Sequence, residues 1–474
     1  MRLPTLRLAV FCAALLVPAG LLIAQDQAPA PGSVEEAPAT EPNPSGEMPE
    51  PSPEEKAKPP RDPMAIYADL NLFGEIFDRI RAEYVDPPDE EELIRAAIQG
   101  MLTSLDPHSG YLPPSDYDET REDISGQFGG LGVEIIMEDQ LIKVVSPIDD
   151  TPAARAGIMA NDLIVEIDGK AVQGMTQDEA VEKMRGPVGT DVTITVIREG
   201  VVDPLEFELT RGIISMRAVR WSMEGGETEG EGDIALLRLS RFSEQAFVGI
   251  ERAIEAIYEE RNNVPPKGII LDLRNNPGGL VDQSVYVADA FLKRGAVVLT
   301  RGRTEAESAR YDAAPDPLDA QLVDIPMVVL INGGSASASE IVAGALQDHK
   351  RATLVGTRSF GKGSVQSIIS LGPDGAMRLT TARYYTPNNR SIQALGITPD
   401  IEIRQVVPAE FQGRDEIIGE AGLEGHITIE GQEESTVGSS VYVPADKSED
   451  TQLQYAIHLI NGEETNEAFP PRAE

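Results

Sequence analysis

Strand-like and helix-like patterns alternate through residues 214–405, and this alternation constrains the fold more than any other feature of the chain. Apolar runs of strand length occur at 234–239, 268–272, 327–331 and 353–356. Helical patterns occupy 245–260, 281–291 and 339–348. A chain that alternates in this way buries its strands in a sheet and packs its helices against that sheet. We therefore expect a layered α/β core over residues 214–405.

Residues 126–213 are expected to form a separate compact unit that is rich in strands. The strand patterns lie at 132–137, 141–146, 162–167, 191–198 and 205–210. One helix is expected at 176–184. Its first residue, Thr176, has Glu179 three positions later, which is the arrangement of a capping box.

The part of the chain before residue 126 divides into three segments. Residues 63–125 are expected to be helical, with Pro87-Pro88 separating two helices. Residues 25–62 are rich in Pro, Glu, Ala and Ser, and they bury too little apolar surface to offset the entropy of ordering. We interpret them as a disordered linker.

Residues 1–24 have the pattern of a secretory signal, with Arg2 and Arg7 before an apolar stretch that ends in small residues. A signal that stays in the membrane as an anchor is the alternative. The only cysteine, Cys12, lies in this stretch, so a mature chain would have no disulfide and no thiol nucleophile. We expect export to the bacterial periplasm or cell envelope.

The formal net charge of the chain is -39. A surface this acidic argues against binding to nucleic acid or to an anionic membrane. Residues 301–324 are polar and are expected to form a surface insertion. Residues 406–474 are interpreted as an acidic C-terminal region, loop-like up to 450 and closed by a helix over 450–459.

A candidate nucleophile lies in the run NGGSASASE at 332–340, between an expected strand and an expected helix. Unpaired N–H groups at a helix N-terminus stabilise a developing oxyanion. Ser337 precedes Lys362 by 25 positions, and a neutral lysine amine can take the proton of a serine. Ser335 and Ser339 remain alternatives. Ser337 also forms a capping-box pattern with Glu340, so a purely capping role competes with the catalytic one.

The candidate base, Lys362, lies between two glycines and close to apolar residues. Such neighbours can desolvate an amine and lower its pKa from about 10.4. An ordinary solvated lysine is the alternative.

Two other motifs overlap this lysine. The spacing from Gly356 to Lys362 resembles a phosphate-binding loop, but Gly363 occupies the position of the Ser or Thr that would hold magnesium. The string SFGK from Ser359 matches the S-x-x-K motif of penicillin-binding enzymes, but the partner motifs S-D-N and K-T-G are missing.

The run FGGLGV at 128–133 precedes an expected strand. Successive glycines allow backbone N–H groups to bind a carboxylate, as in domains that capture a peptide C-terminus by strand addition. The residues expected to bind the peptide are Gly129, Gly130, Leu131, Gly132, Val133, Val181 and Met184, with Ala180 beside them.

Taken in order, these motifs resemble the carboxy-terminal processing proteases, a serine-peptidase family with an inserted PDZ domain. The resemblance covers about residues 65–405 and 450–460. It depends on LDPHSGYL at 105–112, FGGLGV at 128–133, LDLRNNPGGL at 271–280, NGGSASASEI at 332–341 and GKGSVQ at 361–366. It implies an α/β protease core of the ClpP/crotonase-like type, with the PDZ unit at 126–213 and a helical segment before it.

The resemblance also implies roles for individual residues. Ser337 becomes the nucleophile, Lys362 the general base and Gln366 the residue that orients the lysine. The backbone N–H groups of Ala338 and of either Gly278 or Gly279 would form the oxyanion hole. His108 and Ser109 match the family motif and are interpreted as structural.

These observations predict an exported serine endopeptidase that binds the C-terminal tails of protein substrates. No metal or cofactor is implied. A homo-oligomer or an adaptor protein is a further possible partner. Two alternatives are an inactive PDZ scaffold on a hydrolase fold and a crotonase-type lyase. Intact Ser337, Lys362 and Gln366 argue against the first, and the PDZ unit and secretory signal argue against the second.

Overall fold

The computed structural model describes residues 62–138, 140–226, 230, 232–305, 308–429, 434 and 436–471. The expected secretory signal and almost all of the expected linker lie outside these residues. Within the described part of the chain, no helix has both the length and the apolar character needed to cross a membrane.

The chain divides into two units, residues 1–82 and 83–474. The first contains almost all of helix α1 (Pro63–Glu83), which buries none of its residues. In the second unit, α2 (Glu90–Thr103) begins after the two prolines. The carboxylate of its N-cap, Asp89, accepts the N–H groups of Glu91 and Glu92. Helix α3 (Pro114–Ser125) follows, so the expected helical region is confirmed where it is described.

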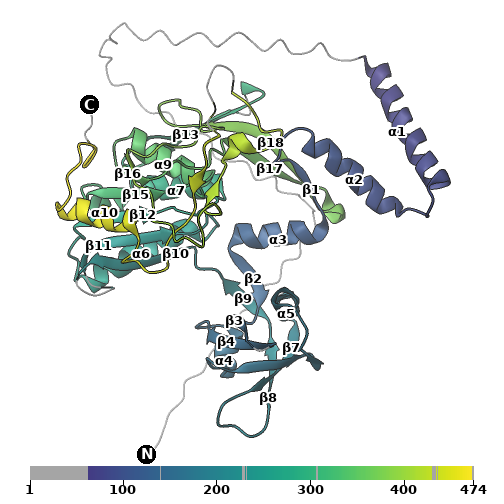
Figure 1. Ribbon diagram of the computed structural model, residues 1–474, viewed down its shortest axis with the longest axis horizontal. Helices are drawn as coiled ribbons and strands as arrows, with labels where there is room; N and C mark the ends of the chain where they lie inside the picture. The colour runs from purple at the N-terminus through teal and green to yellow at the C-terminus, as the bar shows by residue number, and fades with distance from the viewer. Residues whose placement is uncertain are drawn as a thin grey trace, which may run out of the picture. The chain divides into compact units, whose positions relative to one another are not determined.

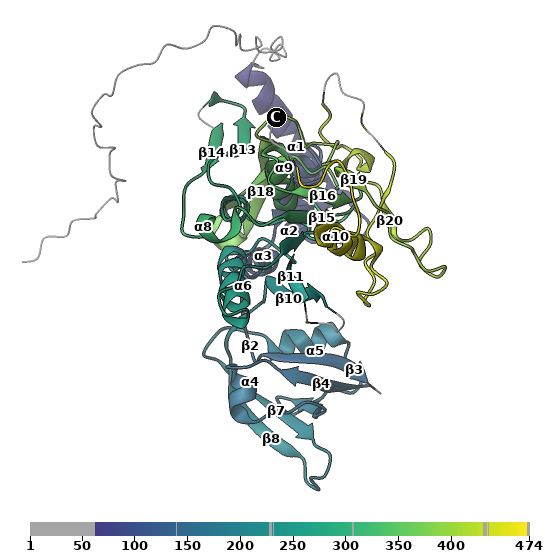
Figure 2. The same ribbon diagram turned by 90° about the vertical axis from the view of Figure 1, so that its left-hand side faces the viewer.

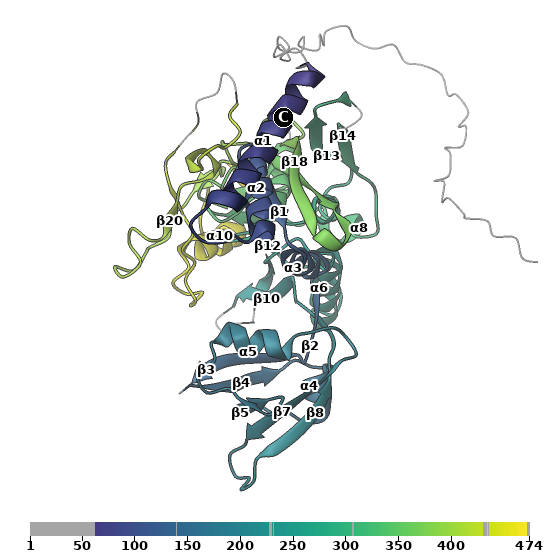
Figure 3. The same ribbon diagram turned by 90° about the vertical axis from the view of Figure 1, so that its right-hand side faces the viewer.

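The inserted domain is built on an antiparallel sheet of order β3-β4-β5-β7-β8, with β6 paired to β5 (Figure 3). Its strands are β3 (Val133–Glu138), β4 (Leu141–Pro147), β5 (Leu163–Ile167), β6 (Lys170–Ala171), β7 (Asp191–Ile197) and β8 (Leu205–Thr210). Its helices are α4 (Pro152–Ala156) and α5 (Gln177–Met184). The predicted capping box is present, because the carboxylate of Glu179 accepts the N–H of Thr176 at 2.7 Å and the Thr176 hydroxyl accepts the N–H of Glu179 at 3.2 Å.

The two ends of this domain lie side by side. Strand β2 (Gln127–Gly130) enters the domain and pairs antiparallel with β9 (Gly212–Ser215), which leaves it. A domain whose ends meet in this way can be inserted into another fold without separating that fold's own elements.

A mainly parallel sheet of the second unit has the order β10-β11-β12-β15-β16-β19, of which β10 to β16 can be followed in Figure 1. All neighbouring strands are parallel except β10 and β11. The strands are β10 (Val219–Gly225), β11 (Gly232–Leu239), β12 (Gly268–Asp272), β15 (Met327–Ile331), β16 (Thr353–Gly356) and β19 (Ile401–Glu402). A parallel sheet is normally covered on both faces, and the apolar character of these strands reflects that burial.

Alternate residues of β11 define the two faces of this sheet. Ala235, Leu237 and Leu239 belong to a core shared with α6 (Ala246–Glu260), α7 (Val281–Asp289) and α9 (Ala338–Asp348). Ile234 and Leu236 belong to a core shared with α10 (Thr451–Asn461). Helices α6 and α10 accordingly lie on opposite sides of the sheet (Figure 2). The layered α/β core is confirmed.

A second sheet carries the lysine motif. Its order is β1-β18-β13-β14, with β17 paired to β18. The strands are β1 (Gly110–Leu112), β13 (Gly295–Gly302), β14 (Ala309–Ala313), β17 (Ser364–Ser370) and β18 (Ala376–Tyr385). Lys362 lies two residues before β17, so the turn that carries it is held by this sheet.

One expectation needs correction. Residues 301–324 are not simply a surface insertion, because they include β14, which pairs with β13, the short helix α8 (Asp319–Leu322) and the buried Leu322. The acidic region is loop-like apart from β20 (Glu416–Ile417), β21 (Ser439–Ser440) and a 3-10 turn at Glu420–Gly422. It is nevertheless packed against the core, with the side chain of Glu420 fully buried.

Candidate active site

Ser337 occupies a sharp turn between β15 and α9. The turn is held by Asn332, whose side-chain oxygen accepts the N–H groups of Asn275 at 2.9 Å and Gly334 at 3.0 Å. Ser337 itself has φ 54° and ψ -114°, outside the regions that non-glycine residues favour. Such strain is maintained only where the surrounding structure fixes it, and it often accompanies a functional side chain.

The three serines of the motif have different surroundings. The Ser335 hydroxyl donates to the carbonyl oxygen of Leu273 at 2.8 Å, and the Ser339 hydroxyl donates to that of Asn276 at 2.8 Å. Both side chains are fully buried, whereas Ser337 retains 6% exposure. Ser337 is therefore the serine of the three whose hydroxyl is not bound to a backbone carbonyl in the described structure.

One buried carboxylate, that of Glu340, joins the serine turn to the lysine turn. The serine turn follows β15 and carries Ser337, and the lysine turn precedes β17 and carries Lys362. Oε2 of Glu340 accepts the N–H of Ser337 at 2.8 Å and the N–H of Lys362 at 2.9 Å. Oε1 accepts the N–H of Gly361 at 2.7 Å and the hydroxyl of Ser359 at 2.5 Å. Burial raises the pKa of Glu340 to about 7, although these four donors oppose the rise. One bond of the expected capping box is therefore present, that from the N–H of Ser337 to the carboxylate of Glu340. The same carboxylate also accepts the three other hydrogen bonds.

Lys362 is half-buried at the end of the lysine turn. Burial lowers the pKa of its amine, and the positive charge of Arg378 lowers it further, while Glu420, Glu340 and Asp106 act in the opposite direction. No hydrogen bond or ion pair in the described structure engages its Nζ. A desolvated amine without a close anionic partner is suited to accept a proton.

Gln366 does not hydrogen-bond to Lys362 in the described structure. Its amide nitrogen donates to the Ser364 hydroxyl at 2.8 Å and to the Thr380 hydroxyl at 3.4 Å. These bonds fix the amide plane of Gln366 and leave its carbonyl oxygen without a described partner.

The two glycines proposed for the oxyanion hole differ in what their N–H groups bind. The N–H of Gly278 donates to the side-chain oxygen of Asn276 at 2.9 Å. Neither Gly279 nor Ala338, the first residue of α9, uses its N–H in a described hydrogen bond. Gly278 packs closely on the nucleophile turn instead, since a Cβ placed on it would lie 2.8 Å from both the carbonyl oxygen of Ala336 and Cβ of Ser337.

Two residues beside the proposed dyad were missed by reasoning from the sequence. Tyr384, on β18, is almost fully buried. Burial raises the pKa of its phenol to about 12, against a smaller opposite effect of its hydrogen bond with the Ser337 side chain. Glu420 reaches the lysine turn from the acidic region. Neither position belongs to a motif that reasoning from the sequence could have used.

The expected peptide-binding residues surround one edge of the inserted domain. Strand β3, which starts at Val133, is the last strand of its sheet, so one side of its backbone is unpaired within that sheet. Leu131 and Met184 are buried in the domain core, and Val181 on α5 is partly exposed. Gly129 and Gly130 pair with β9, and Gly132 has φ +77° and lies against Thr151.

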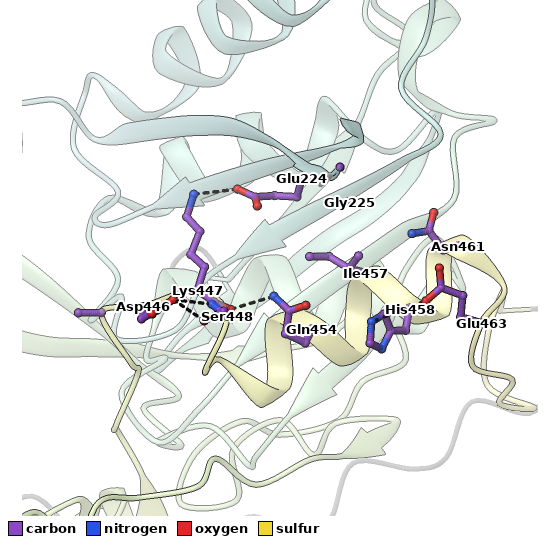
Figure 4. A pocket seen from close by; sticks show the side chains of 12 residues that line it. Glu224, Gly225, Asp446, Lys447, Ser448, Gln454, Ile457, His458, Asn461 and Glu463 are labelled. Carbon is purple, nitrogen blue, oxygen red and sulfur yellow. Dashed lines mark hydrogen bonds and ion pairs between the residues drawn. The ribbon is translucent and has the colours of Figure 1, made fainter. Parts of the chain in front are cut away.

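A polar pocket lies elsewhere, between β10 and α10 (Figure 4). Its lining groups bind one another: Lys447 forms an ion pair with Glu224 at 2.8 Å, and Gln454 donates to the carbonyl oxygen of Lys447 at 2.8 Å. It contains none of the expected catalytic residues. Within the described residues, no cluster of three or more His, Cys, Asp or Glu is arranged to hold a metal ion.

Comparison with known proteins identifies similarities over most of the chain. The model of peptidase family S41 matches residues 233–403, the PDZ domain model matches 129–209, and the model of the activating protease CtpB N-terminal domain matches 39–115. The chain is 52% identical over 405 residues to a carboxy-terminal-processing protease of Bartonella bacilliformis, covering 85% of this chain and 91% of the relative.

Two further similarities are more distant. A carboxyl-terminal-processing protease of Synechocystis sp. is 37% identical over 333 residues, which cover 69% of this chain and 75% of the relative. Among solved structures, the photosystem II D1 C-terminal processing protease is 28% identical, with a TM-score of 0.40, covering 72% of this chain and 95% of that one.

Proposed function

Because the chain belongs to the carboxy-terminal-processing proteases of peptidase family S41 and contains a PDZ domain, we propose that it is an exported serine endopeptidase with a Ser337–Lys362 dyad. The observation that carries the dyad is the Glu340 carboxylate, whose Oε2 accepts the backbone N–H groups of both residues. This one oxygen atom therefore joins two turns that belong to different sheets. Ser337 and Lys362, which these turns carry, are 25 positions apart in the sequence.

In the proposed reaction, the neutral amine of Lys362 removes the proton of the Ser337 hydroxyl as Oγ attacks the carbonyl carbon of the peptide bond. The protonated lysine then donates its proton to the leaving amine as the C–N bond breaks. Water, deprotonated by the same lysine, hydrolyses the acyl-enzyme and restores the serine. The lowered pKa of Lys362 supports this role, since a base must be unprotonated to act.

The negative oxygen formed in each step requires two donors. We assign these to the N–H groups of Ala338 and Gly279. Both groups have no partner in the described hydrogen bonds, whereas the N–H of Gly278 is already used by Asn276. Loss of one such donor typically costs about 100- to 1000-fold in kcat. Gln366, held by Ser364 and Thr380, would present its free oxygen to the lysine ammonium.

The PDZ domain would hold the C-terminal tail of a protein substrate. A tail that adds to the free edge of β3 gains backbone hydrogen bonds, while its carboxylate binds the glycine-rich segment at 129–132, which comprises the end of β2 and the two residues before β3. Val133 and Val181 would contact its apolar side chains. The pattern of residues 1–24 supports export, and the periplasm or cell envelope is the proposed location.

The dyad is tested by replacing each member in the chain without its first 24 residues. Ser337→Ala and Lys362→Ala should each reduce cleavage of a protein with an apolar tail by more than about 1000-fold. Lys293→Ala, which changes an exposed lysine of the same unit, should leave cleavage unchanged. Cleavage that persists in either dyad variant, with the circular dichroism of the folded chain, would contradict the assignment.

A further inference from the structure

The proposed active site is built on three turns: the serine turn after β15, the lysine turn before β17, and the oxyanion turn after β12, which carries Gly278 and Gly279. Part of the acidic region lies against all three. We call residues 415–429 and 436–441 the C-terminal segment. Its Glu420 N–H donates to the Phe360 carbonyl oxygen in the lysine turn at 2.9 Å. Its Ser440 carbonyl oxygen accepts the N–H of Gly333 in the serine turn at 3.2 Å. Its Val441 carbonyl oxygen accepts from the Asn275 side chain, beside the oxyanion turn, at 2.8 Å.

The side chain of Glu420 extends these contacts to the other side of Lys362. It is fully buried, and its carboxylate accepts from the amide nitrogen of Gln393 at 2.9 Å. The side-chain oxygen of that same Gln393 accepts the N–H of Gly363 at 3.0 Å. The backbone is therefore held at Phe360 by Glu420 directly, and at Gly363 by Glu420 through Gln393.

A third segment completes the arrangement. Nε2 of His108 lies 3.0 Å and 2.8 Å from the two carboxylate oxygens of Glu420. The backbone at His108 is in turn held by Asp106, which accepts the N–H groups of His108 at 2.8 Å and Ser109 at 2.9 Å. His108 therefore contacts the carboxylate of Glu420, and in this arrangement its role is to hold that carboxylate in place.

From these contacts we infer that Glu420, a residue of the C-terminal segment, is a positioning residue for Lys362. The inference deepens the proposed function and rests on it. The backbone N–H of Glu420 holds Phe360 before the base, and its side chain holds Gly363 after the base through Gln393. A residue that fixes the backbone on both sides of the base determines where the amine lies relative to Ser337. Displacement of a reacting group by about 1 Å can cost 100-fold in rate.

The charge of Glu420 supplies a readout that a purely structural role would not affect. Four charged groups act on the amine: Arg378 lowers the pKa of Lys362, while Glu420, Glu340 and Asp106 raise it. Removing the charge of Glu420 should therefore allow Lys362 to lose its proton at lower pH. Shortening the side chain while keeping its charge should leave the pH at which Lys362 loses its proton unchanged.

Two variants separate position from charge. Glu420→Gln should lower kcat on a tailed peptide about 10- to 100-fold with KM within about twofold, and should move the acid limb of the kcat profile to lower pH. Glu420→Asp keeps the charge but is one methylene shorter, so kcat should fall and the acid limb should stay at its wild-type position. Glu424→Gln removes an exposed carboxylate four residues away and should resemble the wild type in all respects.

The outcomes are distinct. If Glu420→Gln is folded and matches Glu424→Gln in kcat and in pH profile, the inference is wrong. If Glu420→Gln does not fold, Gln393→Ala carries the test, because it cuts the link to Gly363 and leaves Glu420 in place. A folded Gln393→Ala with wild-type kcat then overturns the inference. A wild-type chain that neither cleaves a tailed peptide nor reacts with a serine-directed probe overturns the proposed function itself.

Discussion

At the scale of single residues, Glu340 is the side chain in which stability and the proposed chemistry meet most closely. It caps α9, binds both members of the proposed dyad and is fully buried. A buried carboxylate is costly when ionised unless donors surround it, and here four donors do. Its raised pKa, about 7, shows that burial outweighs those donors.

This imbalance predicts a pH dependence of stability. Between about pH 4.5 and 7 the folded chain retains a proton on Glu340 that the unfolded chain releases. The free energy of unfolding should therefore decrease as pH rises through this range, by on the order of 3 kcal/mol from this group. Glu340→Gln has no such group and should lack that part of the decrease.

Urea unfolding at pH 5, 6 and 7 measures the effect. The fluorescence of Trp221, the only tryptophan, reports the core because this residue lies on β10. Glu424→Gln serves as the control, since it removes an exposed carboxylate. Equal pH dependence in the wild type and in Glu340→Gln would show that Glu340 does not titrate in this range.

At the scale of elements, the site depends on turns that approach closely. Gly278, in the turn after β12, has φ +99° and contacts the turn that carries Ser337. Gly278→Ala should displace Ser337, because the added Cβ would lie 2.8 Å from its Cβ. We expect kcat to fall at least about 10-fold.

The control for this variant is Gly413→Ala. Gly413 also has a positive φ, +78°, but a Cβ there would meet nothing within 4 Å. Urea unfolding should show a loss of about 1 kcal/mol from backbone strain in both variants, with a further loss in Gly278→Ala from the close contacts of its Cβ. Only Gly278→Ala should lose activity on a tailed peptide. A fully active Gly278→Ala would mean that the two turns can separate without cost to the reaction.

The elements differ in how far the sequence predicts them. Strands at 268–272, 327–331 and 353–356 are predicted to the residue, because burial on both faces makes them continuous apolar runs bounded by polar turns. Helix α5 follows from a local rule, the capping box of Thr176 and Glu179. The family, the fold class and the serine peptidase class, which were predicted from ordered motifs, are confirmed.

What the sequence could not predict is contact between distant segments. The bond between His108 and Glu420 spans 312 positions, and no periodicity or turn signature marks it. The polar composition of residues 309–313 favours a surface insertion, and only their pairing with β13 makes them the strand β14. Glu340 was recognised as a capping residue, but its bonds to the lysine turn depend on how two sheets meet.

At the scale of the whole molecule, the proposed function requires a tail to be bound by one domain and a bond to be cut by another. Leu131 is a poor position for testing the tail site, because it is buried in the PDZ core and a polar substitution there would unfold the domain. Val181 is better suited, since it is partly exposed on α5 and its replacement leaves the core intact.

Val181→Glu should weaken tail binding in two ways. It removes apolar contact area, and it places a negative charge beside the apolar side chains of the tail. We expect KM for a protein with an apolar tail to rise at least about 10-fold, while kcat/KM for a short peptide without a tail stays unchanged. Glu182→Gln, on an exposed neighbour of the same helix, should alter neither value. If Val181→Glu affects both substrates equally, the domain acts on catalysis rather than on capture, and the tail would have to bind elsewhere.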